Sequence, residues 1–366
     1  MLGSSFPDET GGLLPPGDGK DLLAEVTPLL AGADVAFANL EGPLADAGTS
    51  EKCARSRPGR CFAFRVPTRY GNHLKSAGFD VVSLANNHVG DFGDAGRTST
   101  RATLDLLGIR YAGAPGEVAR LEVRGTRVAL VAFSVSGGTN DLRDLPEAAR
   151  IVTAAKAGAD LVVVSVHGGA EGADRQHVPH GHEQFLGEDR GDLRAFARTV
   201  VEAGADLVLG HGPHVVRGME VVKGRLVVYS LGNFATYGGM NLAGPNGLTL
   251  VLEVRLAPDG NFLGGKIHAA RQEKPGGPRL DPAGAIVPLV RRLSEEDFGP
   301  SAVRVAEDGT LSPPAPPVAA GRWRPTEPGR GRGRGRGPEP RPRPGPGPGP
   351  GPRPRPGRSR SRSRSR

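Results

Sequence analysis

The sequence predicts an α/β layered fold, because strand-like apolar runs alternate along the chain with helix-like stretches. Apolar runs rich in Val and Leu recur with little alternation, as in strands that are covered on both faces. These runs lie at 33–42, 79–88, 159–169 and 205–214. Helix-like stretches alternate with them at 21–32, 68–78, 96–108, 143–158 and 191–204. Several of these stretches end in Gly just before a strand, which is a common helix C-terminal signal. Alternating strands and helices are typical of layered α/β domains.

A second pattern follows residue 214, where paired strands replace the alternation. Residues 215–234 and 247–271 read as β-hairpins with Lys-Gly and Asp-Gly turns, and 121–133 reads as a third hairpin. Gly in such two-residue turns supplies the positive φ that a tight hairpin needs. The chain is therefore expected to mix parallel and antiparallel strands.

The charge of the chain is concentrated in its C-terminal tail. The 366 residues carry a net charge of +8, but residues 321–366 alone hold fifteen Arg and two Glu, a net of +13. Residues 1–320 are therefore mildly acidic, at about −5. A nucleic-acid-binding folded domain would show a basic surface, so the composition argues against one.

We expect three regions: a folded domain at 1–295, a Pro/Ala-rich linker at 296–320, and a disordered Gly/Pro/Arg/Ser tail at 321–366. The Gly, Pro, Arg and Ser residues that dominate the tail cannot bury an apolar face. Its Arg-rich repeats could bind phosphate backbones electrostatically, but a low-complexity extension without a role is the favoured interpretation. The sequence does not decide whether Cys53 and Cys61 form a disulfide or remain two free thiols, and the two alternatives are equally favoured.

No apolar run is long enough to span a membrane, and the first residues have neither the basic start nor the apolar stretch of a secretory signal. Localisation is therefore left unassigned by the sequence.

Polar side chains gather where the four apolar runs end. The run at 33–42 ends in Asn39 and Glu41, and the run at 79–88 leads into Asn86, Asn87, His88 and Asp91. The other two runs lead to His167 and Glu171, and to His211 and His214. Ligands bind at the carboxyl ends of the strands in open α/β sheets.

A metal or catalytic site is the interpretation favoured for these residues. A lone loop histidine is more often a surface residue than a ligand, but here four separate strand ends supply imidazole, carboxamide and carboxylate groups. This mixture suits one or two Mn, Zn, Fe or Ni ions better than Ca or Mg. Two such ions could clamp the attacking and leaving oxygens of a hydrolysis.

Five motifs resemble, in order, those of the CapA family of poly-γ-glutamate capsule-synthesis proteins, which has a calcineurin-like metallophosphoesterase fold. They are NLEGPL, GFDVVSLANNHVGDFG, SVHGGAE, AGADLVLGHGPHV and GRLVVYSLGNF, and the resemblance covers residues 1 to about 271. It implies a four-layer αββα sandwich with two mixed β-sheets.

The resemblance also implies roles for single residues. Glu41 and Asn87 match metal ligands, as do His167, His211 and His214, while His88 matches the catalytic acid near the leaving oxygen. Asn39, Asn86, Asp91, Glu171 and Asn233 are expected to bind substrate or support the ligands.

One departure from the family pattern concerns the first residues. The family usually opens with a buried strand that ends in Gly-Asp-x-Met-Leu-Gly, whereas this sequence starts at the Met of that motif, as MLGSSF. Its Asp, normally a metal ligand, is absent, and the loss of the strand is expected to expose a sheet edge. We expect the assigned start to lie inside a longer protein, in which case a signal or anchor would lie upstream. The alternative is a truncated product whose metal site is impaired.

Two functions from different classes follow. The first is a metal-dependent phosphoesterase-type protein of capsule or cell-surface polymer synthesis, acting on an anionic polymer or phosphoester through metal-activated water. The second is a non-catalytic subunit of a synthesis or export complex, which binds polyglutamate or its ligase. Other capsule-synthesis subunits are the expected protein partners.

Overall fold

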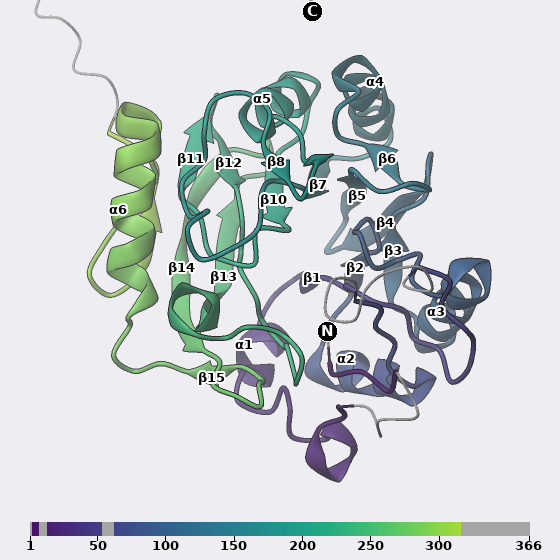
Figure 1. Ribbon diagram of the computed structural model, residues 1–366. Coiled ribbons are helices and arrows are strands. Elements are labelled where there is room, and N and C mark those ends of the chain that lie inside the picture. Colours follow the sequence, from purple (N-terminus) through teal and green to yellow (C-terminus); the bar gives the residue numbers. More distant parts are fainter. Residues whose placement is uncertain (1, 7–12, 53–61, 316–366) are drawn as a thin grey trace, which may run out of the picture. The chain divides into compact units, whose positions relative to one another are not determined.

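A mixed seven-stranded sheet lies at the centre of the structure, a computed structural model that describes residues 2–6, 13–52 and 62–315 (Figure 1). Its strand order is β11-β12-β10-β7-β5-β4, with β6 paired to β5. The central strands are parallel, and β11 and β4 join antiparallel at the edges. The strands are β4 (Val118–Val123), β5 (Thr126–Ser134), β6 (Asn140–Asp141), β7 (Leu161–His167), β10 (Leu207–His211), β11 (Met219–Val222) and β12 (Arg225–Val228).

A second β layer packs on one face of this sheet and consists of two separate sheets. One is parallel and contains β1 (Phe37–Asn39), β2 (Val81–Ser83) and β3 (Arg110–Ala112). The other is antiparallel and contains β13 (Leu248–Leu256), β14 (Phe262–Arg271), β15 (Arg279–Leu280), β16 (Arg304–Val305) and β17 (Thr310–Ser312). A short hairpin of β8 (Gln184–Phe185) and β9 (Glu188–Asp189) stands apart from both layers.

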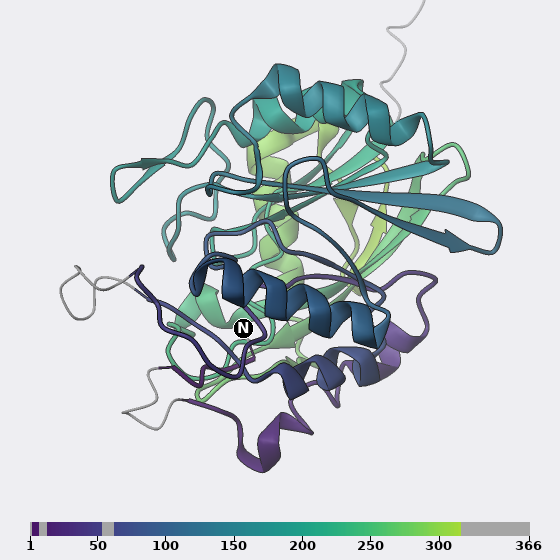
Figure 2. The ribbon, with the colours of Figure 1, turned by 90° about the vertical axis from the view of Figure 1, so that its right-hand side faces the viewer.

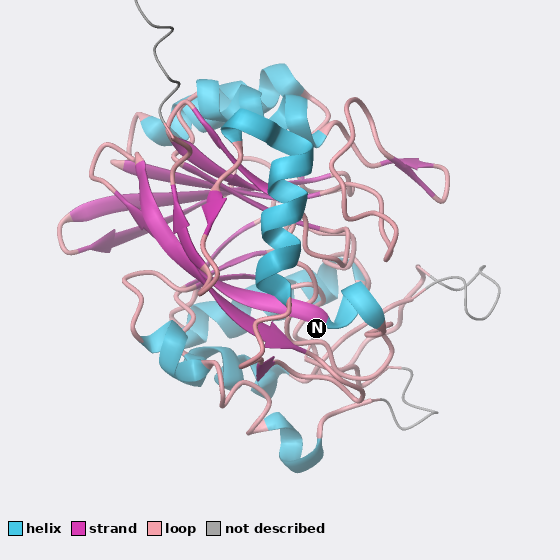
Figure 3. Cartoon of the chain, turned by 90° about the vertical axis from the view of Figure 1, so that its left-hand side faces the viewer, coloured by secondary structure: helices cyan, strands magenta, loops and turns pink. Residues whose placement is uncertain are grey.

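Helices cover the outer faces of the two β layers (Figure 2). The seven-stranded sheet is covered by α4 (Leu145–Lys156) and α5 (Leu193–Glu202), whose buried residues share one apolar cluster with it. The three-stranded sheet packs on α1 (Thr27–Ala31), α2 (Gly71–Ala77) and α3 (Gly93–Leu107). A further helix, α6 (Ile286–Phe298), runs beside the strands and packs on β11, β14 and β16 (Figure 3).

The α/β class and the order of helix, sheet, sheet and helix are confirmed. Apolar side chains fill the space between the β layers in two places: β10, β11 and β12 meet β13 and β14 in one cluster, and β5 meets β2 and β3 in another. The structure differs from the expected pair of mixed sheets in the second layer, which is divided between β1 and β13 into a parallel and an antiparallel part.

All three expected hairpins are present, and two have the turn chemistry that tight hairpins require. The turn residues Arg124 and Gly125 have φ of 51° and 79°, and Lys223 and Gly224 have φ of 48° and 81°. Positive φ at both central positions matches the right-handed twist of the flanking strands.

Two boundaries differ from the sequence expectation. The helix expected at 21–32 is limited to Thr27–Ala31, with Pro28 in its first turn, where the lack of an N–H costs nothing. At the other end, the folded region continues past residue 295. The helix α6 extends to Phe298, and β16 and β17 then add to the sheet through β14, so residues up to 312 contribute strands.

Two other expectations fall outside the described residues: the state of Cys53 and Cys61, and the disorder of 321–366. Within the described ranges, no helix is both long and apolar enough to cross a bilayer.

Candidate functional site

The polar groups predicted at the strand ends meet at one rim of the structure. His167 is the last residue of β7 and His211 the last of β10, and the parallel register places these two residues opposite each other. Glu41 lies two residues after β1, and the Asn86–Asp91 stretch follows β2 in the facing sheet. Two neighbouring strands of each β layer therefore deliver side chains to the same place.

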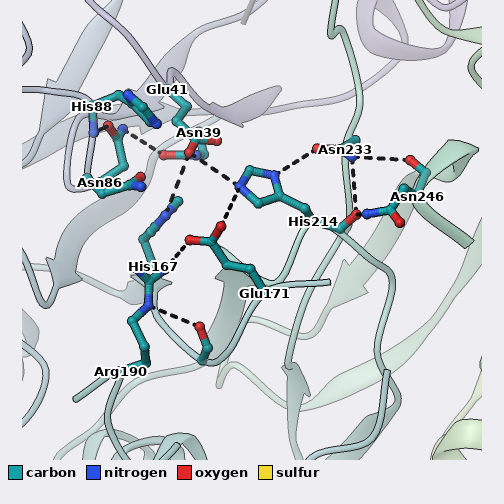
Figure 4. Close-up of polar contacts among 12 residues, drawn as sticks. Asn39, Glu41, Asn86, His88, His167, Glu171, Arg190, His214, Asn233 and Asn246 are labelled. Atoms are coloured by element: carbon teal, nitrogen blue, oxygen red, sulfur yellow. Dashed lines mark hydrogen bonds and ion pairs between the residues drawn. The ribbon is translucent and has the colours of Figure 1, made fainter. Parts of the chain in front are cut away.

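Glu41 is the centre of this cluster (Figure 4). Its Oε1 lies 3.8 Å from His167 Nε2 and 3.9 Å from His214 Nε2. The same His214 nitrogen lies 3.8 Å from Glu171 Oε2. Segments that are about 170 residues apart in the sequence thus place carboxylate and imidazole groups side by side.

Several polar atoms at this rim are buried without a hydrogen-bond partner. They are Glu41 Oε1, Asn87 Oδ1, both ring nitrogens of His167 and His211 Nε2. A buried polar atom without a partner costs about 1–3 kcal/mol, so such a concentration calls for a ligand. Nitrogen and oxygen donors of these types suit a divalent transition-metal ion.

The donors are nevertheless more widely spaced than in a closed metal site. Among the described residues, no three His, Cys, Asp or Glu side chains form a group close enough to hold an ion. The donor chemistry fits a divalent cation, and the separations of 3.8–3.9 Å around Glu41 Oε1 would have to shorten on binding.

Burial sets the protonation of the two strand-end histidines. It lowers the pKa of His167 well below the usual value, and the Arg190 cation adds to this while Glu41 opposes it. Burial also lowers the pKa of His211 to about 4, again against the attraction of Glu41. Both imidazoles are therefore neutral near pH 7, which is the form that binds metal ions.

Glu41 is held as a carboxylate. Burial alone would raise its pKa, but the nearby imidazoles of His214, His167 and His88 outweigh this effect and lower the pKa far below the usual value. Of these three imidazoles, that of His214 lowers the pKa of Glu41 most, and its Nε2 faces the same Glu41 oxygen.

His88 is held by Asp91 three residues later in the chain. His88 Nδ1 donates to Asp91 Oδ2 at 2.7 Å, and the Asp91 side chain is fully buried. Lys52 pairs with the other Asp91 oxygen at 2.5 Å and also donates to the Asn87 carbonyl at 2.9 Å. The backbone N–H of His88 donates to Asn86 Oδ1 at 3.1 Å.

Asn86 in turn connects the two strand ends of the three-stranded sheet. Its side-chain amide donates to Asn39 Oδ1 at 3.1 Å and to the Leu40 carbonyl at 2.9 Å (Figure 4). The structure thus places Asn39 and Asn86 together as supports of the loops that carry Glu41 and His88.

His214 is oriented by two asparagines. Its Nδ1 donates to Asn233 Oδ1 at 2.9 Å, which leaves Nε2 facing Glu41 and Glu171. Asn233 and Asn246 each donate to the His214 carbonyl at 3.1 Å. These contacts hold His214 in a left-handed conformation with φ of 59°, which is uncommon for a residue other than Gly.

Three contributors were not found in the sequence: Lys52, Arg190 and Asn246. Arg190 is 2 % exposed, and its guanidinium lies 3.1 Å from Glu171 Oε1 and 2.9 Å from Glu188 Oε2. None of these residues belongs to a strand-end motif, and their contacts come from loops distant in the sequence. No local signal in the chain points to them.

Comparison of the sequence with known proteins identifies a matching family. Residues 8–237 match the family described as bacterial capsule synthesis protein PGA_cap. The chain is 30% identical over 230 residues to the capsule biosynthesis protein CapA of Bacillus anthracis, covering 57% of this chain and 52% of that protein. It is 32% identical over 178 residues to the PGA biosynthesis protein CapA of Bacillus subtilis, covering 44% and 43%. These matches confirm the resemblance inferred from the motifs.

A third relative is the probable polyglutamine synthesis accessory protein of Mycobacterium tuberculosis H37Rv, 28% identical over 205 residues, which cover 47% of this chain and 50% of that one. The chain thus spans about half the length of the curated relatives it matches. Among solved structures, a putative 5'-nucleotidase from Staphylococcus aureus aligns with a TM-score of 0.37 and 12% identity, over 71% of this chain and 58% of that one.

Proposed function

Because the chain belongs to the bacterial capsule synthesis protein family, we propose that it takes part in the synthesis of a capsule or cell-surface polymer of the poly-γ-glutamate type, as a metal-dependent phosphoesterase-type protein. The names of its relatives, which refer to capsule and PGA biosynthesis, support the polymer class. The substrate would be an anionic polymer or a phosphoester.

The observation that carries the proposal is the set of buried donors without partners at the rim. Glu41, Asn87, His167 and His211 would hold one or two divalent cations together with His214. A cation of this class supplies Lewis acidity toward a phosphoryl or acyl oxygen and makes water more acidic. The neutral state of His167 and His211 leaves their ring nitrogens able to coordinate.

His88 would act as the proton donor to the leaving oxygen. Because Asp91 accepts the Nδ1–H, the Nε2 atom is the ring position that remains to exchange a proton with substrate. Lys52 binds Asp91 through its other oxygen, so the group that accepts the Nδ1–H is itself held in place. His88 is 8 % exposed and is therefore largely shielded from bulk water.

Glu171 and Asn233 would act as supports rather than ligands. Arg190 holds Glu171 at 3.1 Å, and Glu171 faces His214 Nε2 on the side away from Asn233. The ring of His214 is thereby fixed from both nitrogens, with Nε2 directed at the cluster.

Purified protein tests the proposal by metal titration and by hydrolysis of bis-p-nitrophenyl phosphate with added Mn²⁺ or Zn²⁺. We expect His88→Ala to lower the rate by about 10²–10⁴-fold while metal binding persists. The matched control is His182→Ala, because His182 is exposed and its polar contact is with Asp189, away from the rim. Equal rates for the two variants, or a protein that takes up no metal at any concentration, would refute the enzymatic function.

A second candidate function is a non-catalytic subunit that binds polyglutamate or its ligase. It is favoured by the name of the Mycobacterium tuberculosis relatives, an accessory protein of polyglutamine synthesis. In that case poly-γ-glutamate should bind with equal affinity to the parent and to His88→Ala, without turnover of either phosphoesters or polymer. Loss of polymer binding in the His88 variant together with loss of turnover would instead favour the enzyme.

A further inference from the structure

Arg97 on α3 lies at the rim of the candidate site, between two of the loops that form it. Its guanidinium packs against Gly90, two residues after His88, and against Gly138 in the loop that follows β5. The parallel register places the last residue of β5 opposite His167. The guanidinium therefore lies between the segment that carries His88 and the strand end beside His167.

Glycine at both contact positions lets the guanidinium come this close to the two loops. A Cβ at Gly90 would lie 2.7 Å from Nη2 of Arg97, and a Cβ at Gly138 would lie even closer to Nη1. Gly138 also has a φ of 81°, in the left-handed region that favours Gly. The sequences of the two loops thus leave room for a planar charged group between them.

The Arg97 side chain uses few of its hydrogen-bond donors. A guanidinium offers a fork of N–H groups. Within the described ranges, these groups make one hydrogen bond, from Nη2 to the Gly137 carbonyl at 3.4 Å, which is beyond the usual range of about 2.7–3.2 Å. The Nε atom is buried without a hydrogen-bond partner. A purely structural link between α3 and this loop would be expected to use more of these donors.

The described part of the chain also offers Arg97 no carboxylate partner. Lys52 and Arg190, two other cations at this rim, pair with Asp91 and Glu171. Arg97 is half-buried and makes no such pair, so an anion from outside the chain can serve as its counterion. Because residues 1–320 carry a net charge of about −5, an anionic substrate requires local positive groups of this kind.

We propose that Arg97 binds an oxyanion of the substrate, a carboxylate or a phosphate, next to the group that lies at the buried donors. Planar bidentate pairing with such oxyanions is the interaction for which a guanidinium is suited. The inference rests on the proposed function, because it takes this rim to be the place where an anionic polymer or phosphoester binds. Arg97 thus favours substrates that carry a second negative group beside the first.

The test measures the binding of two fluorescein-labelled oligomers of equal length to the full chain by fluorescence anisotropy. One is γ-linked glutamate, which presents carboxylates, and the other is poly(glycerol phosphate), which presents phosphates. Arg97→Met removes the charge and keeps most of the alkyl stem, and the matched control Arg150→Met removes the same charge from the exposed face of α4. We expect Arg97→Met to weaken the binding of at least one oligomer by about tenfold or more, and Arg150→Met by less than about twofold. The oligomer that is affected identifies the oxyanion.

The salt dependence separates a binding role from a disturbed structure. At about 0.5 M NaCl the difference between the parent and Arg97→Met should fall to about threefold or less, because salt screens a partly exposed ion pair. If Arg97→Met is recovered unfolded, weaker binding by Arg97→Lys with an unchanged Arg150→Lys control supports the same conclusion, since Lys keeps the charge but not the fork. Binding requires no turnover, so a parent that hydrolyses no phosphoester would refute the enzymatic function while the oligomer affinities still decide the role of Arg97.

Three results would overturn the proposal. The first is the absence of binding of both oligomers to the parent protein. The second is an equal affinity of the parent and the Arg97 variant for both oligomers, or equal losses in the Arg97 and Arg150 variants. The third is an affinity loss in Arg97→Met that stays the same at low and high salt, because the substitution would then act through the fold of the two loops.

Discussion

The buried ion pair between Arg217 and Glu183 supports the loop that follows β7. Breaking this pair should lower the free energy of unfolding of the protein. The Arg217 side chain is 0 % exposed and that of Glu183 is 4 % exposed. Two hydrogen bonds of 2.8 Å join the guanidinium to the carboxylate. Glu183 also accepts the Ala170 N–H at 2.9 Å, and Arg217 donates to the Ala170 carbonyl at 3.2 Å. The pair thus anchors the residue next to Glu171.

Glu183→Gln removes one charge and leaves the guanidinium buried without its counterion. Breaking a buried pair in this way costs about 3–5 kcal/mol of unfolding free energy, because one charge stays desolvated. Each kcal/mol shifts the midpoint of a domain of roughly this size by about 2–4 °C, so the expected drop is roughly 6–20 °C. Replacing both partners by apolar residues, as in Arg217→Met with Glu183→Leu, should cost less than Glu183→Gln alone.

Thermal melts followed by circular dichroism and urea titrations measure these differences. The matched control is Glu147→Gln, which breaks the exposed pair of Glu147 with Arg150 on α4 and should leave the midpoint nearly unchanged. The reasoning is refuted if Glu183→Gln melts within about 2 °C of the parent, or if the apolar double variant is the less stable one.

Three further predictions concern the site and its supports. Asp91→Asn should lower phosphoesterase activity by about 10–100-fold, because the His88 imidazole loses its charged acceptor. Steady-state rates are measured at a temperature below the unfolding midpoint of the variant, since Lys52 also loses its charged partner. An unchanged rate would show that Asp91 does not act through His88. Gly210→Ala should lower the free energy of unfolding by about 1–3 kcal/mol, because a Cβ at this position would lie 2.2 Å from the Tyr229 carbonyl oxygen. Urea titrations measure this difference. An unchanged free energy of unfolding would mean that β10 can shift to make room. Burial, with Glu220 beside the phenol, raises the pKa of Tyr229 well above the usual value. The neutral Tyr229 side chain therefore contributes its full stabilisation below pH 10. This stabilisation is lost as the pH rises above 10, because the tyrosine of the unfolded chain then ionises while the buried one does not. Urea titrations between pH 8 and about pH 11 should show this loss for the parent and a smaller one for Tyr229→Phe, and equal slopes would contradict the assignment.

The sequence by itself determined the strands and hairpins that are specified by residues close together in the chain. Apolar runs without alternation identified β7 and β10 as strands covered on both faces, and Gly in tight turns identified the hairpins. The residues at the strand ends were also readable, because parallel strands bring their carboxyl ends to one edge of a sheet. The closeness of Glu41, His167 and His214 follows from that rule.

Only the tertiary structure decided the features that depend on contacts between distant segments. The short strands β16 and β17 have little pattern of their own and exist because β14 offers them an edge. Lys52 and Arg190 reach Asp91 and Glu171 across loops, so no spacing in the sequence marks them. The division of the second layer likewise arises from which edges meet, since backbone pairing between strands far apart in the chain is set by packing and not by the composition of either strand.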